Sequence, residues 1–285
     1  MSDSQMVPVK ETSSELVVIR PSKAWAPLDL KELWRYRELI YFLTWRDVKV
    51  RYAQTLLGAS WVILQPLIQM FVFNFIFGTI ADVPTDGIPR PLFTYAGLLG
   101  WNLFSKGLTT AGNSMVSNRN MITKIYFPRL ILPLSSILSG LVDFAVSSVI
   151  MIILMVIYKA PPTANVWALP LFMILAIMTS LGAGLWLAPL NVHYRDIRFI
   201  IPLATSLLQY LSPVAYPLSQ ISGDLRWVFA LNPMVGVVEG FRWALFGYEQ
   251  TLGKEIWLSI GVALVLFITG IFYFRKMEKT FADIV

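Results

Sequence analysis

The sequence predicts an all-α membrane protein with six transmembrane helices, an N-terminal amphipathic interface helix and a re-entrant helical hairpin before the last span. The first observation is that thirty consecutive residues between Arg51 and Asp82 contain no Asp, Glu, Lys or Arg, and comparable stretches follow. A helix needs about 20 apolar residues to cross a bilayer core. Composition agrees, because the mean hydropathy is +0.63 and charged residues make up 14% of the chain, against about 25% in a typical soluble domain.

The N-terminal region divides into two parts. Residues 1–28 are polar and contain three prolines, which predicts a flexible cytoplasmic tail. Residues 29–57 form the predicted interface helix, in which apolar residues recur at helical spacing and basic residues fall on the other side. Its candidate interface residues are Trp34, Arg35, Tyr41 and Trp45. A membrane surface and a partner protein both require this apolar stripe, so the pattern leaves the two alternatives open.

The region 58–274 is predicted to be a single transmembrane domain. Its spans are expected at about 58–80, 92–114, 130–158, 167–190, 199–217 and 256–274, and residues 275–285 form a second cytoplasmic tail. The second span contains Lys106 and the third contains Asp143. Ionisable residues inside a membrane usually face protein or water rather than lipid. For Asp143, a functional role and a hydrogen bond between helices remain alternatives.

The distribution of basic residues predicts the orientation. The N-terminal segment, the loops after spans two and four, and the C-terminal tail together hold 17 Lys and Arg residues, whereas the opposite loops hold 5. Because positive residues are retained on the cytoplasmic side, both termini of this multi-pass chain are expected in the cytoplasm. The formal net charge of +6 does not indicate nucleic-acid binding, since the basic residues flank apolar spans.

Residues 218–247, on the predicted outer side, interrupt the simple pattern of spans. Their apolar runs are too short to cross a bilayer and are separated by Asn232-Pro233 and by glycines. This predicts a re-entrant hairpin, which is tolerated at membrane depth only where protein or a cavity shields its backbone. The alternative is an amphipathic hairpin that lies on the surface and is anchored by Trp227 and Trp243.

Catalytic and metal-binding patterns are missing from the sequence. There is no cysteine, no HExxH or GxSxG motif and one histidine, His193, so neither a catalytic residue nor a metal site is predicted. Transporters driven by ion gradients often contain inverted repeats and carboxylates near the midplane, and no such repeat is evident. ATP is the alternative energy source. Because no GxxxxGK[ST] motif exists, we expect no cofactor on this chain and an ATPase on a separate polypeptide.

Four segments in this order resemble a known family. They are RYAQTLLGASWVILQPL entering the first span, NRNMITKIYFPRLILPL from Asn118, NVHYRDIRFIIP from Asn191 and LNPMVGVVEGFRWALFG from Leu231. Together with the order of helices, they resemble the permease subunit of type-2 ABC exporters of O-antigen, teichoic acid and capsule polysaccharides. The resemblance implies a homodimer in the bacterial cytoplasmic (inner) membrane, bound to two copies of a nucleotide-binding subunit that carries ATP and Mg. The implied cargo is a lipid-linked polysaccharide.

The resemblance also implies which residues receive mechanical input from the ATPase. Two cytoplasmic loops are expected to do so, and the interface helix is expected to brace against the same subunit. The candidate coupling residues are Asn118, Arg119, Lys124, Tyr126, Phe127, Pro128, His193, Tyr194, Arg195 and Asp196. Asn118 is expected to cap a short helix that ends at Pro128. The alternative for this first loop is a plain positively charged connector.

Aromatic residues are the candidates for the substrate pathway. Sugar rings present apolar C–H patches that pack on aromatic faces, and their hydroxyls require polar partners. The candidates are Tyr95, Trp101, Phe104, Tyr210 and Tyr216. The alternative for each is ordinary packing against lipid or neighbouring helices.

Three other functions remain open at this point. A permease of the same class that carries a small lipophilic or drug cargo would share the spans and the partner. A membrane-bound glycan-modifying enzyme would need the catalytic groups that the sequence lacks. A structural scaffold for a synthase would need no pathway, so it should tolerate changes in the segment 218–247.

Overall fold

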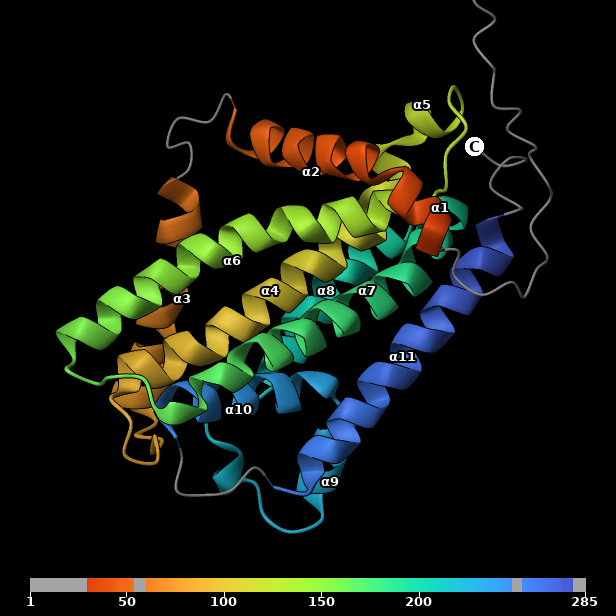
Figure 1. Ribbon diagram of the computed structural model, residues 1–285. Helices are drawn as coiled ribbons and strands as arrows, with labels where there is room; N and C mark the ends of the chain where they lie inside the picture. The colour runs from red at the N-terminus through yellow and green to blue at the C-terminus, as the bar shows by residue number, and fades with distance from the viewer. Residues whose placement is uncertain (1–29, 54–59, 248–252, 279–285) are drawn as a thin grey trace, which may run out of the picture.

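Helices are the only regular secondary structure in the part of the chain that the computed structural model describes, which is residues 30–53, 60–247 and 253–278. Figure 1 shows the helices gathered into one bundle. They are α1 (Leu30–Arg35), α2 (Arg37–Tyr52), α3 (Ser60–Phe73), the π-helix η1 (Asn74–Ile80), α4 (Arg90–Ser117), α5 (Arg119–Ile122), α6 (Ile131–Ile157), the 3-10 helix η2 (Ala164–Ala168), α7 (Leu169–His193), α8 (Ile197–Tyr210), the 3-10 helix η3 (Leu218–Gln220), α9 (Leu225–Ala230), α10 (Pro233–Phe246) and α11 (Glu255–Glu278). The predicted tail 1–28 lies outside the described residues.

Helix α4 lies at the centre of the bundle and packs against α3, α6, α7, α8 and α10. Small residues permit the closest of these contacts. A Cβ atom added at Gly107 of α4 would lie 2.8 Å from the Ser180 hydroxyl of α7, and one added at Gly184 of α7 would lie 2.6 Å from the Ala111 side chain. Such small residues let the backbones of membrane helices approach closely. Most of α4 is consequently buried by neighbouring helices.

Within the described residues, four helical segments are long and apolar enough to cross a membrane. They are Ser60–Ile80, Ile131–Ile157, Ala164–His193 and Glu255–Glu278. These segments coincide with the predicted first, third, fourth and sixth spans. The last helix continues through Glu278, past the predicted end of the sixth span at residue 274. Helix α11 has no proline or glycine between residues 271 and 278 that would end it earlier.

The second and fifth predicted spans are not among these four. Helix α4 contains the predicted segment 92–114 and is long enough, but it carries many polar residues, which its burial among other helices accommodates. Helix α8 ends at Tyr210, so the predicted helix 199–217 is too long. Its 14 residues span about 21 Å, which is less than a bilayer core of about 30 Å. Pro213 and Pro217 disfavour a continuation of the helix. Six crossings therefore stay a prediction.

The predicted interface helix is present with one interruption, at Tyr36, and it ends at Tyr52, with residues 54–57 outside the described part. One face of α1–α2 packs on the bundle through Leu33, Leu39 and Leu43. Trp34, Tyr41 and Trp45 lie on the opposite face, where each is more than half exposed. The predicted aromatic stripe therefore remains available to a membrane surface or a partner protein.

The segment predicted to be re-entrant forms η3, α9 and α10 at the end of the bundle opposite α2, as Figure 1 shows. Asn232 begins α10, because its side chain accepts a hydrogen bond from the Met234 backbone N–H at 3.0 Å. Helix α10 packs against α4, α7 and α11 and is largely buried. Packing inside the bundle argues against a surface position for α10, whereas Leu225, Trp227 and Val228 of α9 are exposed. The depth of α9 and α10 in a membrane stays a prediction.

Candidate functional site

The helix in the first predicted coupling loop is shorter than the sequence suggests. Helix α5 covers Arg119–Ile122, so the expected helix ending at Pro128 is wrong, and residues 123–130 before α6 are not helical. Asn118 precedes α5, but its side chain makes no capping bond. Its carboxamide oxygen instead accepts from Arg46 at 2.8 Å, and its amide nitrogen donates to the Ser114 carbonyl at 2.8 Å. These competing partners explain the missing cap.

The loop presents a mixed surface to solvent. Arg119, Lys124 and Tyr126 are exposed, whereas Phe127 is buried and anchors the loop to the bundle. Partial burial, and secondarily the nearby carboxylate of Glu32, raise the pKa of Tyr126. Its hydroxyl therefore stays protonated at neutral pH and can donate a hydrogen bond to a partner.

The second predicted coupling segment follows α7. Tyr194, Arg195 and Asp196 are exposed. His193 is partly buried, and its Nδ1 lies 3.1 Å from the Pro189 carbonyl one helical turn earlier. This contact with the backbone of its own helix is typical of a structural histidine.

A hydrophobic cluster joins these separate segments. We call it the α2-end cluster; its buried members are Leu43, Met115, Phe127, Ile131, Leu132, Leu185, Ala188 and Phe274. These residues come from α2, α4, the α5–α6 loop, α6, α7 and α11. Close-packed interiors have low compressibility and transmit displacement. A displacement of Phe127 in the first predicted coupling loop would therefore reach α2 and α4 through side-chain packing, whereas the segment 193–196 connects to the cluster through helix α7.

Three of the predicted pathway residues are buried in the core of the chain. Tyr95, Trp101 and Phe104 are each less than 4% exposed and belong to the main core around α4. The Tyr95 hydroxyl donates to the Ser147 carbonyl at 3.1 Å, which satisfies it inside the core. They pack in the core of this chain, and a role in the substrate pathway stays a prediction. Residue type alone does not reveal whether these side chains face a pathway or the core.

The other two pathway candidates lie near the end of α8. Tyr210 is exposed, and its carbonyl accepts a hydrogen bond from the Tyr216 hydroxyl at 2.9 Å. The Tyr210 ring lies 6.5 Å from that of Phe73 on α3. Tyr210 and Tyr216 are thus close together.

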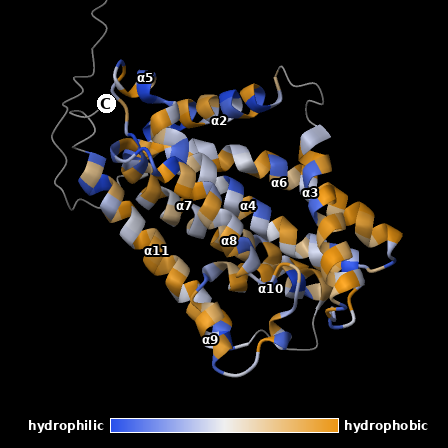
Figure 2. Cartoon of the chain, turned by 180° about the vertical axis from the view of Figure 1, so that it is seen from behind, coloured by the Kyte–Doolittle hydropathy of each residue, from blue (hydrophilic) through white to orange (hydrophobic). Residues whose placement is uncertain are grey.

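A groove beside α4 carries hydroxyl, amide and charged side chains on an otherwise mostly apolar lining, and the sequence reasoning did not identify it; we call it the polar groove after these side chains. It consists of two adjoining cavities of about 400 Å³ and 460 Å³ that share Thr109 and Thr110. The first lies between α3, α4 and α6, with Thr205 of α8 at its edge, and the second lies between α2, α4 and α6. Its lining from α4 consists mainly of hydroxyl and amide side chains: Asn102, Ser105, Thr109, Thr110, Asn113 and Ser117. Figure 2 shows blue and white residues along α4, whereas α11 is mostly orange.

The sequence does contain a signal for this groove. Polar residues recur every three or four positions from Asn102 to Ser117, and again at Ser136, Ser139, Asp143 and Ser147 of α6. This is the spacing of one helix face. Recognising the groove required knowing that these two faces are turned toward the same space, which the sequence alone does not provide.

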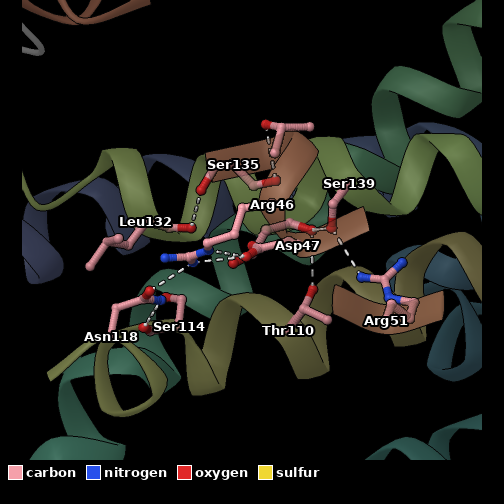
Figure 3. Close-up of polar contacts among 11 residues, drawn as sticks. Arg46, Asp47, Arg51, Thr110, Ser114, Asn118, Leu132, Ser135 and Ser139 are labelled. Carbon is pink, nitrogen blue, oxygen red and sulfur yellow. Dashed lines mark hydrogen bonds and ion pairs between the residues drawn. The ribbon is translucent and has the colours of Figure 1, made fainter. Parts of the chain in front are cut away.

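Three charged side chains from three helices meet in the groove. The Asp143 carboxylate of α6 forms ion pairs with Arg51 of α2 and Lys106 of α4, both through Oδ2. Arg51 also donates to the Ser139 hydroxyl at 3.0 Å. Figure 3 shows Arg51 beside Ser139, and Thr110 on the facing side of the groove. Asp143 therefore does bond to other helices, and it also lines a cavity.

Both coupling segments are linked to the groove by hydrogen bonds. Arg46, which lines the second cavity, donates to Asn118 at the start of α5 (Figure 3). Asn191, two residues before His193, donates to the Asn113 side chain at 2.9 Å. Asn113 also lines the second cavity. A displacement of either segment therefore acts directly on residues of the groove.

Comparison with known proteins gives a consistent result. A model of the family described as ABC-2 type transporter matches residues 38–246. The chain is similar to the O-antigen export system permease protein RfbA of Myxococcus xanthus, with 29% identity over 257 residues that cover 89% of this chain and 98% of that protein. It is 27% identical over 241 residues to the polysialic acid transport protein KpsM of Escherichia coli, covering 82% and 91%. The capsule polysaccharide export inner-membrane protein CtrC of Neisseria meningitidis is 23% identical over 257 residues, covering 88% and 95%.

Proposed function

The chain belongs to the ABC-2 type transporter family, and we propose that it is the membrane subunit of an ATP-driven exporter that moves a lipid-linked polysaccharide out of the cytoplasm. The observation that carries the proposal is the polar groove, since hydroxyl and amide side chains in an otherwise apolar bundle suit a hydroxyl-rich cargo. The relatives named above, each described by its printed name as a protein of O-antigen, polysialic acid or capsule transport, support the choice of cargo.

The proposed assembly contains two copies of this chain and two copies of a nucleotide-binding subunit, with ATP and Mg on the latter. It lies in the bacterial inner membrane with both chain termini in the cytoplasm. The ends of α4 and α7 support the proposed position of the ATPase, since they carry exposed Arg119 and Arg195 at loops that are linked to the groove.

In the proposed mechanism, ATP binding in the partner displaces α5 and the segment 193–196. The α2-end cluster passes this displacement to α2 and α4. Because the groove lies between α2, α4 and α6, their relative movement changes its width. The chain itself supplies the pathway and no reacting group, and the partner supplies the energy of ATP hydrolysis.

Deletion of this chain in its host tests the proposal. We expect loss of one surface polysaccharide and accumulation of its lipid-linked form on the cytoplasmic face, with restoration by the wild-type chain. Affinity purification of the tagged chain in mild detergent should recover a nucleotide-binding subunit and ATPase activity. An unchanged polysaccharide surface after deletion, with no precursor accumulating, would contradict the choice of cargo.

A further inference from the structure

The charged cluster in the polar groove contains more positive than negative charge. Arg51 and Lys106 share a single carboxylate, Asp143, so the cluster carries a net charge of +1 when all three groups are ionised. The nearest additional pair on α2, Arg46 with Asp47, is neutral overall. In a partly dehydrated groove an excess positive charge favours the binding of an anion.

The carboxylate that holds the two cations is satisfied at only one of its two oxygens. Both ion pairs use Oδ2 of Asp143, while Oδ1 is buried and has no hydrogen-bond partner among the described residues. A buried carboxylate with a purely structural role usually has both oxygens satisfied. Arg51 and Lys106 are the partners that the structure shows for the Asp143 carboxylate. An incoming anion would therefore compete with Asp143 for these two side chains.

The donors around the cluster match the chemistry of phosphate. A phosphate group presents several oxygens that accept hydrogen bonds, and the arginine fork together with a lysine ammonium is well suited to it. The hydroxyls of Ser139 and Thr110 lie in the same groove, but each donates its proton to a backbone carbonyl of its own helix, so the donors for the phosphate are Arg51 and Lys106. Figure 3 shows Thr110, Ser139 and Arg51 together beside α2.

The first of the two cavities, between α3, α4 and α6, also borders an apolar surface. Trp61 and Gln65 of α3 line it, and α3 exposes Trp61, Leu64 and Ile68. Almost none of the apolar segment Ser60–Ile80 is buried by the rest of the chain. A ligand with a charged head and a hydrocarbon tail would place its head on the cations and its tail along α3.

We propose that Arg51 and Lys106 bind the phosphate-bearing headgroup of the lipid to which the cargo is attached, and that Asp143 occupies these two cations until the headgroup arrives. This rests on the proposed function and deepens it by naming the part of the cargo that this chain recognises. Arrival of the headgroup releases Asp143 of α6 from Arg51 of α2 and from Lys106 of α4. Cargo binding therefore loosens the contacts between the helices that form the groove.

Binding of farnesyl diphosphate to the purified full-length chain in phosphatidylcholine nanodiscs tests the proposal. We expect R51Q and K106Q each to raise the Kd about tenfold to hundredfold, because each removes a charge-assisted contact. R51K, which keeps the charge, should lose less. D143N should lower the Kd, because it removes the competing carboxylate. The control K254Q changes an exposed lysine at the far end of the bundle and should leave the Kd unchanged.

The opposite signs separate recognition from structural support. A merely structural cluster would give weaker binding in D143N as well as in R51Q, and this result would overturn the proposal. An unchanged Kd in both R51Q and K106Q would also overturn it. Each variant must elute as a single species of wild-type size, and D143N supplies the test even if R51Q fails to fold.

Further probes distinguish the sources of phosphate. Farnesol and inorganic diphosphate should each bind more weakly than farnesyl diphosphate, since each lacks one half of the ligand. Equal binding of inorganic diphosphate would overturn the lipid assignment. Complete competition by phosphatidylglycerol in the nanodisc would assign the site to ordinary membrane lipid and overturn the cargo assignment.

Failure of this inference is distinguishable from failure of the proposed function. If deletion of the chain abolishes surface polysaccharide while R51Q and K106Q bind the probe normally, the site is wrong and the exporter stands. If the probe binds as expected while deletion leaves the surface polysaccharide intact, the proposed function is wrong.

Discussion

Two clusters of buried charge lie in different parts of the bundle and differ in how fully their groups are satisfied. In the first, Arg242 of α10 is completely buried and pairs with Glu239 at 3.2 Å. Arg242 also donates to the carbonyls of Phe93 at 3.2 Å and Val214 at 2.5 Å, and its guanidinium lies 3.5 Å from the centre of the Phe93 ring. In the second, Arg51 and Lys106 share Asp143 beside a cavity.

On this difference rests the assignment of a structural role to Arg242 and the proposal of a ligand-binding role for Arg51 and Lys106. Arg242 connects α10 to the start of α4 and to the segment after α8, all within the protein core. The Asp143 cluster has an excess positive charge, a carboxylate oxygen without a hydrogen-bond partner among the described residues, and an adjoining cavity. A satisfied buried ion pair fixes the position of a helix, whereas an incompletely satisfied one beside a cavity is suited to exchange partners.

The largest expected effect on stability is that of Arg242→Met. Removing the guanidinium takes the ion-pair partner from Glu239 and a hydrogen-bond donor from the Phe93 and Val214 carbonyls. Breaking a buried pair in this way costs about 3–5 kcal/mol. Thermal unfolding of the purified chain in detergent should show a clear loss of Tm. The double variant Arg242→Met with Glu239→Gln should recover part of it, and Lys254→Met should have no effect. A wild-type Tm for Arg242→Met would remove the distinction between the two clusters.

Asp143→Asn should have a smaller effect on stability and a larger one on export. The change removes both ion pairs, but the groove is partly open, so we expect a cost of about 1–3 kcal/mol. Export should fall because the headgroup then binds more tightly to Arg51 and Lys106 and is released slowly. Surface polysaccharide per unit of chain in the membrane gives the comparison with Arg242→Met. Equal losses of stability in the two variants would show that both clusters are structural.

Asn118→Ala should have a still smaller effect, because it removes one link between the coupling loop and α2. The Arg46 and Ser114 contacts are lost, at a cost of about 1 kcal/mol. We expect ATP hydrolysis to continue with less polysaccharide exported per ATP. Asn120→Ala is the matched control, since Asn120 is exposed on the same short helix. Identical coupling ratios in the two variants would argue against transmission through Asn118.

The smallest effect on stability is expected from Arg119→Glu and Arg195→Glu. Both side chains are exposed at the end of the bundle proposed to face the ATPase, so reversing their charge should not change the Tm of the isolated chain. Recovery of the nucleotide-binding subunit with the chain should fall, or transport should uncouple from hydrolysis. The control Lys254→Glu reverses a charge at the opposite end. Normal assembly and export in both arginine variants would exclude the proposed docking position.

Much of the fold follows from local patterns in the sequence. The charge-free run before Asp82 corresponds to α3 and η1, and α6 and α7 begin and end within a few residues of the predicted spans. Hydrophobicity and length determine these helices, so they are readable from a single segment. The length of α8 was overestimated because apolar residues continue past Tyr210 while the prolines that follow prevent a helix.

The site was harder to predict because it depends on contacts between distant segments. Lys106 and Asp143 were recognised as unusual, but their pairing and the participation of Arg51 require α2, α4 and α6 to be placed together. Likewise, Trp101 and Phe104 are aromatic residues of the kind that bind sugars, yet burial in the core of the chain uses them for packing. Residue type identified candidates, and only the three-dimensional arrangement separated groove from core.

The most direct test of the central claim is an ATP-dependent transport assay in inverted membrane vesicles. In these vesicles the cytoplasmic face is outward, so exported lipid-linked polysaccharide moves into the lumen and becomes protected from added glycosidase. We predict ATP-dependent protection in vesicles that contain this chain and its ATPase partner, and none in vesicles that lack the chain. Equal protection with and without the chain would contradict its role as the membrane subunit of the exporter.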